Sequence, residues 1–165
     1  MRCPQAVRSK RDHTQDSPIS YRLPVERPHR AEDARVAETA SSLAREFFAL
    51  LESKDYDGLD AFLHPDVVFA PAMFPGRLYE GHDEVLRGFY ELVFSLPAYR
   101  PEASRFTELS PETVLVDGRI HFVDERGSLH DKSAFWVLAF SGDRLLSLRG
   151  KGSRAEALKL AAQAS

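Results

Sequence analysis

Residues 113–151 have the sequence TVLVDGRIHFVDERGSLHDKSAFWVLAFSGDRLLSLRGK, and their pattern is the strongest indication of the fold. Apolar and polar residues alternate along most of it, the two-residue period of strands with one buried face. Gly127-Ser128 and Gly142-Asp143 interrupt the alternation as short turns, and strands joined by such turns pair antiparallel. The stretch therefore predicts an antiparallel meander of three strands, at 113–124, 129–140 and 144–151.

One more strand is expected at 103–109, because a Ser110-Pro111 turn separates this segment from the next strand. Within 113–124, Asp117-Gly118 could close a tight hairpin or bend one long strand, and we interpret it as a bend. Downstream, Ser153 and Glu156 have the spacing of a capping box, which predicts a short closing helix over 153–162.

Before the strands, apolar residues recur at steps of three and four, the period of helices with one buried face. Pro65 and Pro97 each end a helical segment, because proline disfavours helical geometry in the residue before it. His64 is therefore expected at a helix end, and a proline-rich loop is expected to extend to about Gly81. The predicted elements are helices over about 33–54, 55–63 and 82–96, with a brief strand at 67–69.

This order of elements predicts an α+β fold, in which a layer of helices packs on one curved sheet. The chain has 165 residues, 43% of them apolar and 28% charged, which suits one globular domain. Its apolar runs are all shorter than the roughly 20 residues that cross a bilayer, so no membrane role is expected. The single cysteine, Cys3, can form neither an internal disulfide nor a multi-cysteine zinc site.

Residues 1–31 are expected to form a disordered leader before a domain at 32–165. The first 30 residues hold four prolines and no apolar periodicity, and their seven basic and three acidic residues give a net charge of +4. They lack the apolar core of a secretory signal, so a cytoplasmic location is expected. Whether this leader is functional or a start-site artefact stays open. The other 15 basic and 22 acidic residues give −7, which disfavours a nucleic-acid partner.

Five short segments carry a resemblance to a known family. They are KDYDGL at 54–59, HPDVVF at 64–69, YEGHDEV at 79–85, FWVL at 135–138 and RLLSL at 144–148. In this order and spacing, residues 33–160 resemble the nuclear transport factor 2-like (NTF2-like) superfamily, and within it the SnoaL-like and ketosteroid-isomerase-like proteins. The resemblance implies a cone of three helices on a curved, mainly antiparallel sheet, with a short C-terminal helix. It also implies an apolar pocket between helices and sheet, and a homodimer.

The isomerase's proton-transfer residues do not carry over to this chain. Counted without gaps from 55–59, its oxyanion-stabilising tyrosine falls on Phe47 and its general-base aspartate on Pro71. Its second aspartate falls on Trp136. All three positions are apolar, so ketosteroid isomerase chemistry is not expected.

Alternation along the strands predicts which side chains line the pocket. On this basis His121 is expected to point inward with Val123 and to be the polar anchor for a ligand, although a neighbouring side chain or water could equally satisfy it. If the protein is an enzyme, His121 would transfer a proton and Tyr90 or Arg119 would stabilise negative charge. The expected ligand-binding residues are Phe47, Phe69, Val123, Trp136, Leu138 and Leu148. No cofactor and no metal are expected, because the histidines lack the spacing of a metal motif.

Three functions stay open from the sequence. The first is a SnoaL-like protein that binds a small hydrophobic molecule. The second is a cofactor-independent cyclase, isomerase or dehydratase that uses His121 as acid and base. The third is a module without a ligand that dimerises through Phe122, Phe135 and Val137 on the outer face of the sheet.

Overall fold

The computed structural model describes residues 39–94 and 98–163, without the side chains of residues 93 and 94. The predicted leader lies outside the described residues.

The first helix forms because its apolar stripe packs against the rest of the domain. Helix α1 spans Ala40–Ser53, and Thr39 caps it by accepting a hydrogen bond from the Ser42 N–H at 3.2 Å. Its buried stripe is Ala40, Leu43, Ala44, Phe47, Phe48 and Leu51.

Helix α2 spans Tyr56–Phe62, and its cap, Asp55, accepts from the Gly58 N–H at 2.9 Å. The chain turns extended at Leu63, two residues before the proline that was expected to end the helix. The prediction that His64 lies at a helix end is therefore wrong: it is the second residue of strand β1, Leu63–Ala70. Pro65 fits this position because proline and the residue before it both favour extended backbone.

The third helix is shorter in its α-helical part than predicted. Helix α3 spans His82–Phe89 and widens into a π-helical turn, η1, at Tyr90–Phe94, while residues 95–97 lie outside the described residues. Asp83 and Glu84 lie in its first turn, where the helix dipole favours negative charge. Its buried face, which includes Val85, Leu86 and Phe89, packs over β1.

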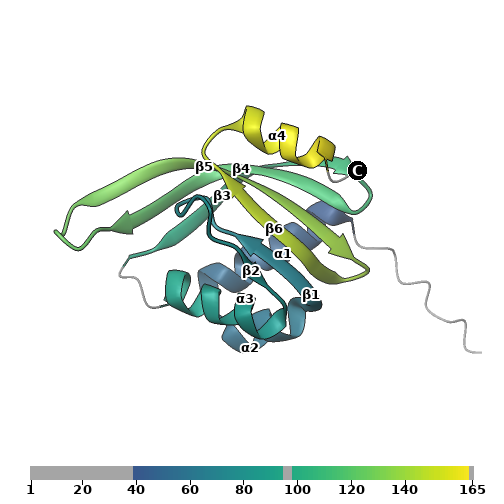
Figure 1. Ribbon diagram of the computed structural model, residues 1–165, viewed down its shortest axis with the longest axis horizontal. Coiled ribbons are helices and arrows are strands. Elements are labelled where there is room, and N and C mark those ends of the chain that lie inside the picture. The colour runs from purple at the N-terminus through teal and green to yellow at the C-terminus, as the bar shows by residue number, and fades with distance from the viewer. Residues whose placement is uncertain (1–38, 95–97, 164–165) are drawn as a thin grey trace, which may run out of the picture. The chain divides into compact units, whose positions relative to one another are not determined.

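Six strands form one mixed sheet in the order β2-β1-β6-β5-β4-β3 (Figure 1). The predicted meander is confirmed, and β1 joins its last strand in parallel. The two-residue strand β2 falls in the segment that was predicted as loop. The strands after β1 are β2 at Tyr79–Glu80, β3 at Arg100–Ser110, β4 at Thr113–Val123, β5 at Leu129–Ser141 and β6 at Arg144–Lys151.

Asp117-Gly118 does not interrupt β4, which confirms that this pair lies within one long strand. The irregularity is on the neighbouring strand, where the register shifts between Ala103 and Arg105. A Cβ at position 118 would collide with the carbonyl oxygen of Glu102 and with the Trp136 ring. Glycine is required there because two strands and a tryptophan approach its backbone closely.

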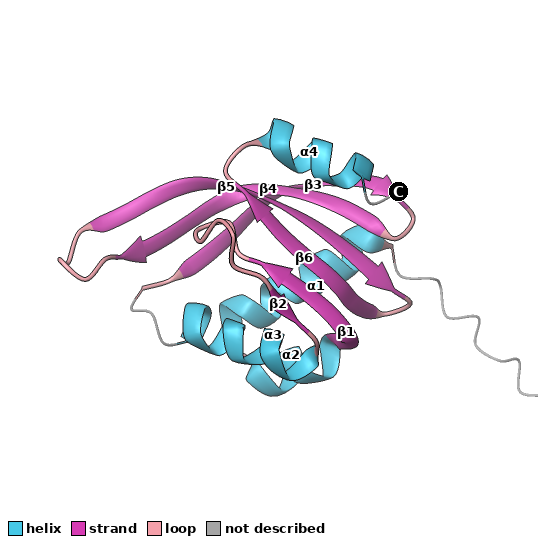
Figure 2. Ribbon diagram, in the orientation of Figure 1, coloured by secondary structure: helices cyan, strands magenta, loops and turns pink. Residues whose placement is uncertain are grey.

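The sheet separates two layers of helix (Figure 2). Helices α1, α2 and α3 cover one face, the inner face, over the main apolar core, while α4 at Arg154–Gln163 covers part of the other, the outer face. All these elements belong to one unit, residues 35–165, and the α+β fold is the one predicted. None of the helices in the described ranges is long and apolar enough to span a membrane.

Candidate functional site

The pairing of β4 with β5 decides which side chains face the helices. Trp136 lies opposite Val116, and both are buried in the main core. His121 is five residues beyond Val116, an odd number, so it lies on the opposite face of the strand. The prediction that His121 and Val123 point inward with Trp136 is therefore wrong. Both lie on the outer face, the face on which Leu115 packs against α4.

His121 lies between two carboxylates on that outer face. Its Nε2 is 3.3 Å from Oε2 of Glu102, without hydrogen-bonding geometry, and its Nδ1 is 3.6 Å from Oδ1 of Asp131. Arg119 Nε donates to the same Asp131 oxygen at 2.6 Å. This contact lowers the pKa of Asp131 and raises the pKa of Arg119. The cluster is built from β3, β4 and β5, and it brings His121 and Arg119 together with the carboxylates of Glu102 and Asp131.

Tyr90 is not brought together with His121 and Arg119. It begins the π-helical turn after α3, in the layer that covers the inner face, and the residue is 56% exposed. Its ring contacts the Tyr56 ring edge-on, with centroids 6.1 Å apart. The three predicted catalytic residues therefore do not form one site.

Five of the predicted ligand-binding side chains belong to the packed core: Phe47, Phe69, Trp136, Leu138 and Leu148. Phe47 and Leu138 have no water-accessible surface, so neither lines a space that admits water. The Phe47 ring lies 5.8 Å from the Phe89 ring and 6.2 Å from the Phe62 ring, centroid to centroid. Neighbouring side chains therefore fill the position where a ligand was expected beside Phe47.

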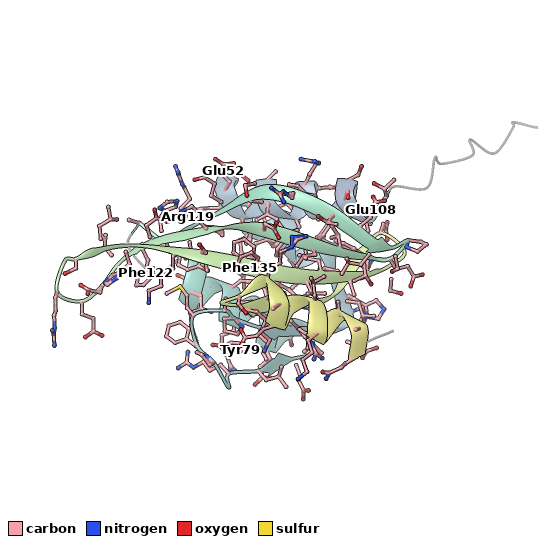
Figure 3. All side chains as sticks on the ribbon, turned by 90° about the horizontal axis from the view of Figure 1, so that it is seen from above. Glu52, Tyr79, Glu108, Arg119, Phe122 and Phe135 are labelled. Atoms are coloured by element: carbon pink, nitrogen blue, oxygen red, sulfur yellow. The ribbon has the colours of Figure 1, made fainter. Side chains whose placement is uncertain are left out.

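The apolar outer surface proposed for a dimer is arranged differently from the prediction. Phe122 lies on the inner face and stacks on the His130 ring at 4.7 Å. Phe135 and Val137 do lie on the outer face, but they pack against α4 in the small cluster around Leu115. The part of this face beyond α4 carries Arg119, His121 and Asp131, which contact one another. Arg119 is labelled in Figure 3.

A groove of about 460 Å³ lies between α1 and the edge strand β3, and we call it the α1–β3 groove. Phe48 forms part of its apolar wall, and the Phe48 ring contacts Phe106 at 6.2 Å and Trp136 at 5.1 Å. Phe48, Phe106 and Trp136 therefore form one aromatic cluster, and the groove lies along the side of this cluster that is accessible to solvent. Its lining residues are Arg45, Phe48, Ala49 and Glu52 from α1, and Arg100, Pro101, Glu102, Ala103 and Phe106 from β3.

The rim of the α1–β3 groove carries two cations and two carboxylates. Arg100 Nη2 pairs with Oε2 of Glu102 at 3.1 Å, and the same oxygen lies 3.3 Å from His121. The Arg45 guanidinium lies over the Phe106 ring, 4.1 Å from its centroid. Within the described part of the chain, neither Arg45 nor Glu52 forms an ion pair. Sequence reasoning missed these residues, because their only signal is the helical spacing of Arg45, Phe48 and Glu52 along one side of α1.

A second hollow, of about 510 Å³, lies at the start of α3 and is lined by Pro65, Glu80, Gly81, His82, Asp83, Glu84 and Arg87. Its polar groups largely satisfy one another. His82 Nε2 lies 3.0 Å from the Asp60 carbonyl oxygen, a contact that raises the pKa of His82, with Asp83 adding to the effect. In the chain as described, no three His, Cys, Asp or Glu side chains are grouped to hold a metal ion.

Tyr99 is a further polar residue that sequence reasoning missed. It immediately precedes β3 and packs, half-buried, against the main core. Burial raises the pKa of Tyr99 to about 12. Its phenol therefore stays protonated at neutral pH and can donate a hydrogen bond.

A helical layer on a curved mixed sheet is the architecture of NTF2-like proteins. The SnoaL-like domain model matches residues 44–146, more than half of the chain. The chain belongs to the SnoaL-like domain family. None of the curated proteins matches it significantly.

Solved structures with this fold include proteins crystallised with small molecules. An NTF2-like protein of unknown function from Burkholderia pseudomallei is 25% identical, with a TM-score of 0.61, over 74% of this chain and 97% of that one. A Mycobacterium tuberculosis protein in complex with estradiol-17β-hemisuccinate is 13% identical, with a TM-score of 0.60, over 72% and 97%. TerC, co-crystallised with polyporic acid, is 17% identical, with a TM-score of 0.59, over 73% and 96%.

Proposed function

We propose that this protein binds a small, largely apolar molecule in the α1–β3 groove. The observation that carries the proposal is a groove of about 460 Å³ with an apolar wall and a charged rim. Ligand sites typically measure roughly 300–1,000 Å³ and combine apolar walls with a few polar groups that orient the ligand. Two NTF2-like neighbours were crystallised with small molecules, which supports the same kind of function for this fold.

The groove is favoured over a site beside Phe47 because apolar surface stays accessible there. Ala103 and Phe106 are half-buried, whereas Phe47 and Leu138 are fully enclosed. A ligand can cover Ala103 and Phe106 without displacing a core side chain. Removing such surface from water is favourable by about 25 cal/mol per Å².

This proposal changes the role expected for His121. The imidazole reaches the groove only through Glu102, whose Oε2 lies 3.3 Å from Nε2. We therefore place His121 behind the rim, in contact with the Glu102 carboxylate that pairs with Arg100. A cyclase, isomerase or dehydratase reaction that uses His121 directly would need a second binding place on the outer face.

A bulky side chain in the groove tests the proposal. Ala49 lines the groove from an exposed position on α1, so Ala49→Trp should fill the space and leave the core intact. The control is Ala155→Trp, at an exposed position on α4 outside the groove. Binding of neutral 2-naphthamide would be followed by the amide resonances of the full-length protein.

We expect 2-naphthamide to shift amides of α1 and β3 in the wild type and in Ala155→Trp, and to leave Ala49→Trp unaffected. An Ala49→Trp variant that binds equally well would overturn the proposal, as would a wild type that binds neither 2-naphthamide nor its carboxylate analogue, 2-naphthoate. The homodimer, the cytoplasmic location and the absence of a nucleic-acid partner stay predictions. Sedimentation of the purified chain at micromolar concentration would test the first of them.

A further inference from the structure

We propose that the α1–β3 groove selects a ligand that carries a carboxylate, and that Arg45 binds this group. The inference rests on the function proposed above, because it names the ligand class for the same groove. It follows from the charges on the rim and from the way in which one of them is held.

Three of the four ionic groups on the rim differ in whether they already have an ionic partner. Arg100 is paired with Glu102 at 3.1 Å, and Glu102 also faces His121 at 3.3 Å. A ligand carboxylate would have to compete with Glu102 for Arg100. Arg45 has no such competitor, because no carboxylate in the described part of the chain lies within ion-pair distance of it. Arg45 is therefore the cation of the rim that is open to an anion.

The position of Arg45 is set by an aromatic ring. Its guanidinium carbon lies 4.1 Å from the centroid of Phe106, which is within the range of a cation–π contact. A guanidinium that lies over a ring keeps its N–H donors in its own plane. These donors can form the paired, fork-like hydrogen bonds that arginine makes with a carboxylate. Phe106 thus holds the cation at the groove without using its donors.

Glu52 makes the two ends of the groove electrostatically different. It lines the same side of α1 seven residues after Arg45, which corresponds to about 10 Å along the helix axis. A ligand carboxylate is attracted at the Arg45 end and repelled at the Glu52 end. The apolar wall around Phe48 lies between these two ends of the helix side. The arrangement fits a molecule with an apolar body and one acidic end.

A pair of matched probes tests this inference on the full-length protein. We compare 2-naphthoate with 2-naphthamide, which has the same ring system and no charge, by the shifts of amide resonances. Naphthoate should bind about tenfold more tightly, the effect expected of one exposed, charge-assisted contact. Arg45→Gln should remove this preference, and Arg45→Lys should keep only part of it. Raising the salt concentration should weaken naphthoate alone.

Two further variants separate the site from general charge effects. Arg126→Gln removes the same charge from the exposed turn between β4 and β5 and should leave both affinities unchanged. Glu52→Gln should strengthen naphthoate binding, because it removes the repelling carboxylate.

The possible results distinguish the two proposals. Equal affinity for both probes, unchanged in Arg45→Gln, would overturn the carboxylate inference and leave the apolar-ligand function standing. Failure of both probes to bind the wild type would overturn the proposed function itself. A naphthoate preference that Arg126→Gln reduces as much as Arg45→Gln does would show general attraction by surface charge, and would also overturn the assignment to Arg45.

Discussion

Gly118 shows how the identity of one residue can be determined by its neighbours on two other strands. It lies on the inner face of β4, with the Glu102 carbonyl of β3 on one side and the Trp136 ring of β5 close by. The sequence indicated a special position at Asp117-Gly118, because this pair is common in turns and bends. It could not indicate the reason, which is a close approach made by residues far away in the chain.

Replacing Gly118 by alanine should therefore destabilise the protein strongly. The new Cβ would overlap the Glu102 backbone and the Trp136 ring, and forced overpacking of this kind costs about 1–3 kcal/mol. Gly152→Ala is the matched control, because no atom lies within 4 Å of a Cβ there. Denaturant unfolding of both variants measures the effect. Equal stability of Gly118→Ala and Gly152→Ala would contradict the packing around β4.

Tyr99 makes stability depend on pH in the alkaline range. Burial raises the pKa of Tyr99 from 10.0 to about 12, so the folded state holds the phenolic proton more tightly than the unfolded state. This contribution to stability is complete below pH 10 and is lost as the pH rises towards 12. Tyr99→Phe should therefore lose less stability over this range than the wild type. The difference in phenolate absorbance between the two proteins should be centred near pH 12, and a midpoint near 10 would show that Tyr99 is not desolvated.

Most of the elements could be predicted from hydrophobic period and turn residues, because these signals are local. The meander from β3 to β6 matches its predicted bounds within a few residues. Two features had no local signal. The strand β2 is two residues long, and it exists because Glu80 pairs with Val68 of β1. The parallel pairing of β1 with β6 joins segments about eighty residues apart.

The face of His121 was predicted wrongly for a related reason. Alternation divides a strand into two faces but does not say which face meets the helices. That choice depends on register, and a slip of one residue moves every side chain to the other face. Here the register is set by the turn at 124–128, where the Asp124 carboxylate accepts hydrogen bonds from the Arg126 and Ser128 N–H groups at 2.9 and 2.8 Å. This places His121 opposite Asp131.

The contact that holds helix α4 on the outer face of the sheet can be tested by mutation. It contacts the outer face through few buried side chains, chiefly Ala157 and Ala161 on Leu115 and Val137, and Arg154 pairs with Asp117 at 3.3 Å. Ala157→Asp would bury an unpaired charge, which is unfavourable enough that we expect the helix to detach instead. Hydrogen exchange of the α4 amides should then become fast, while β4 and β5 stay protected.

Ala155→Asp is the control for this change, because Ala155 is exposed on the same helix and lies nearer its N-terminus, where negative charge is favourable. Slow exchange of α4 in both variants would show that the contact with Leu115 and Val137 does not hold the helix.

In the whole domain, the aromatic side chains that fill the core continue into the wall of the groove. Phe47 contacts both Phe62 and Phe89 inside, whereas Phe48 connects Trp136 to Phe106 at the groove. The helical stripe identified the residues of this core from the sequence. It could not show how completely they fill the space between helices and sheet, because that depends on shape complementarity between elements.

A cavity made in the core would test this filling directly. Phe47 has no accessible surface, so Phe47→Ala should cost about 3–5 kcal/mol and leave an apolar space beside Phe62 and Phe89. Such spaces stay dry and can admit benzene. Benzene should therefore raise the unfolding temperature of Phe47→Ala and have no effect on the wild type. If Phe47→Ala does not fold, Phe47→Leu provides a smaller cavity for the same measurement. Equal stabilisation of the wild type by benzene would mean that a native space already exists beside Phe47, and the ligand site would then belong inside the cone instead of in the α1–β3 groove.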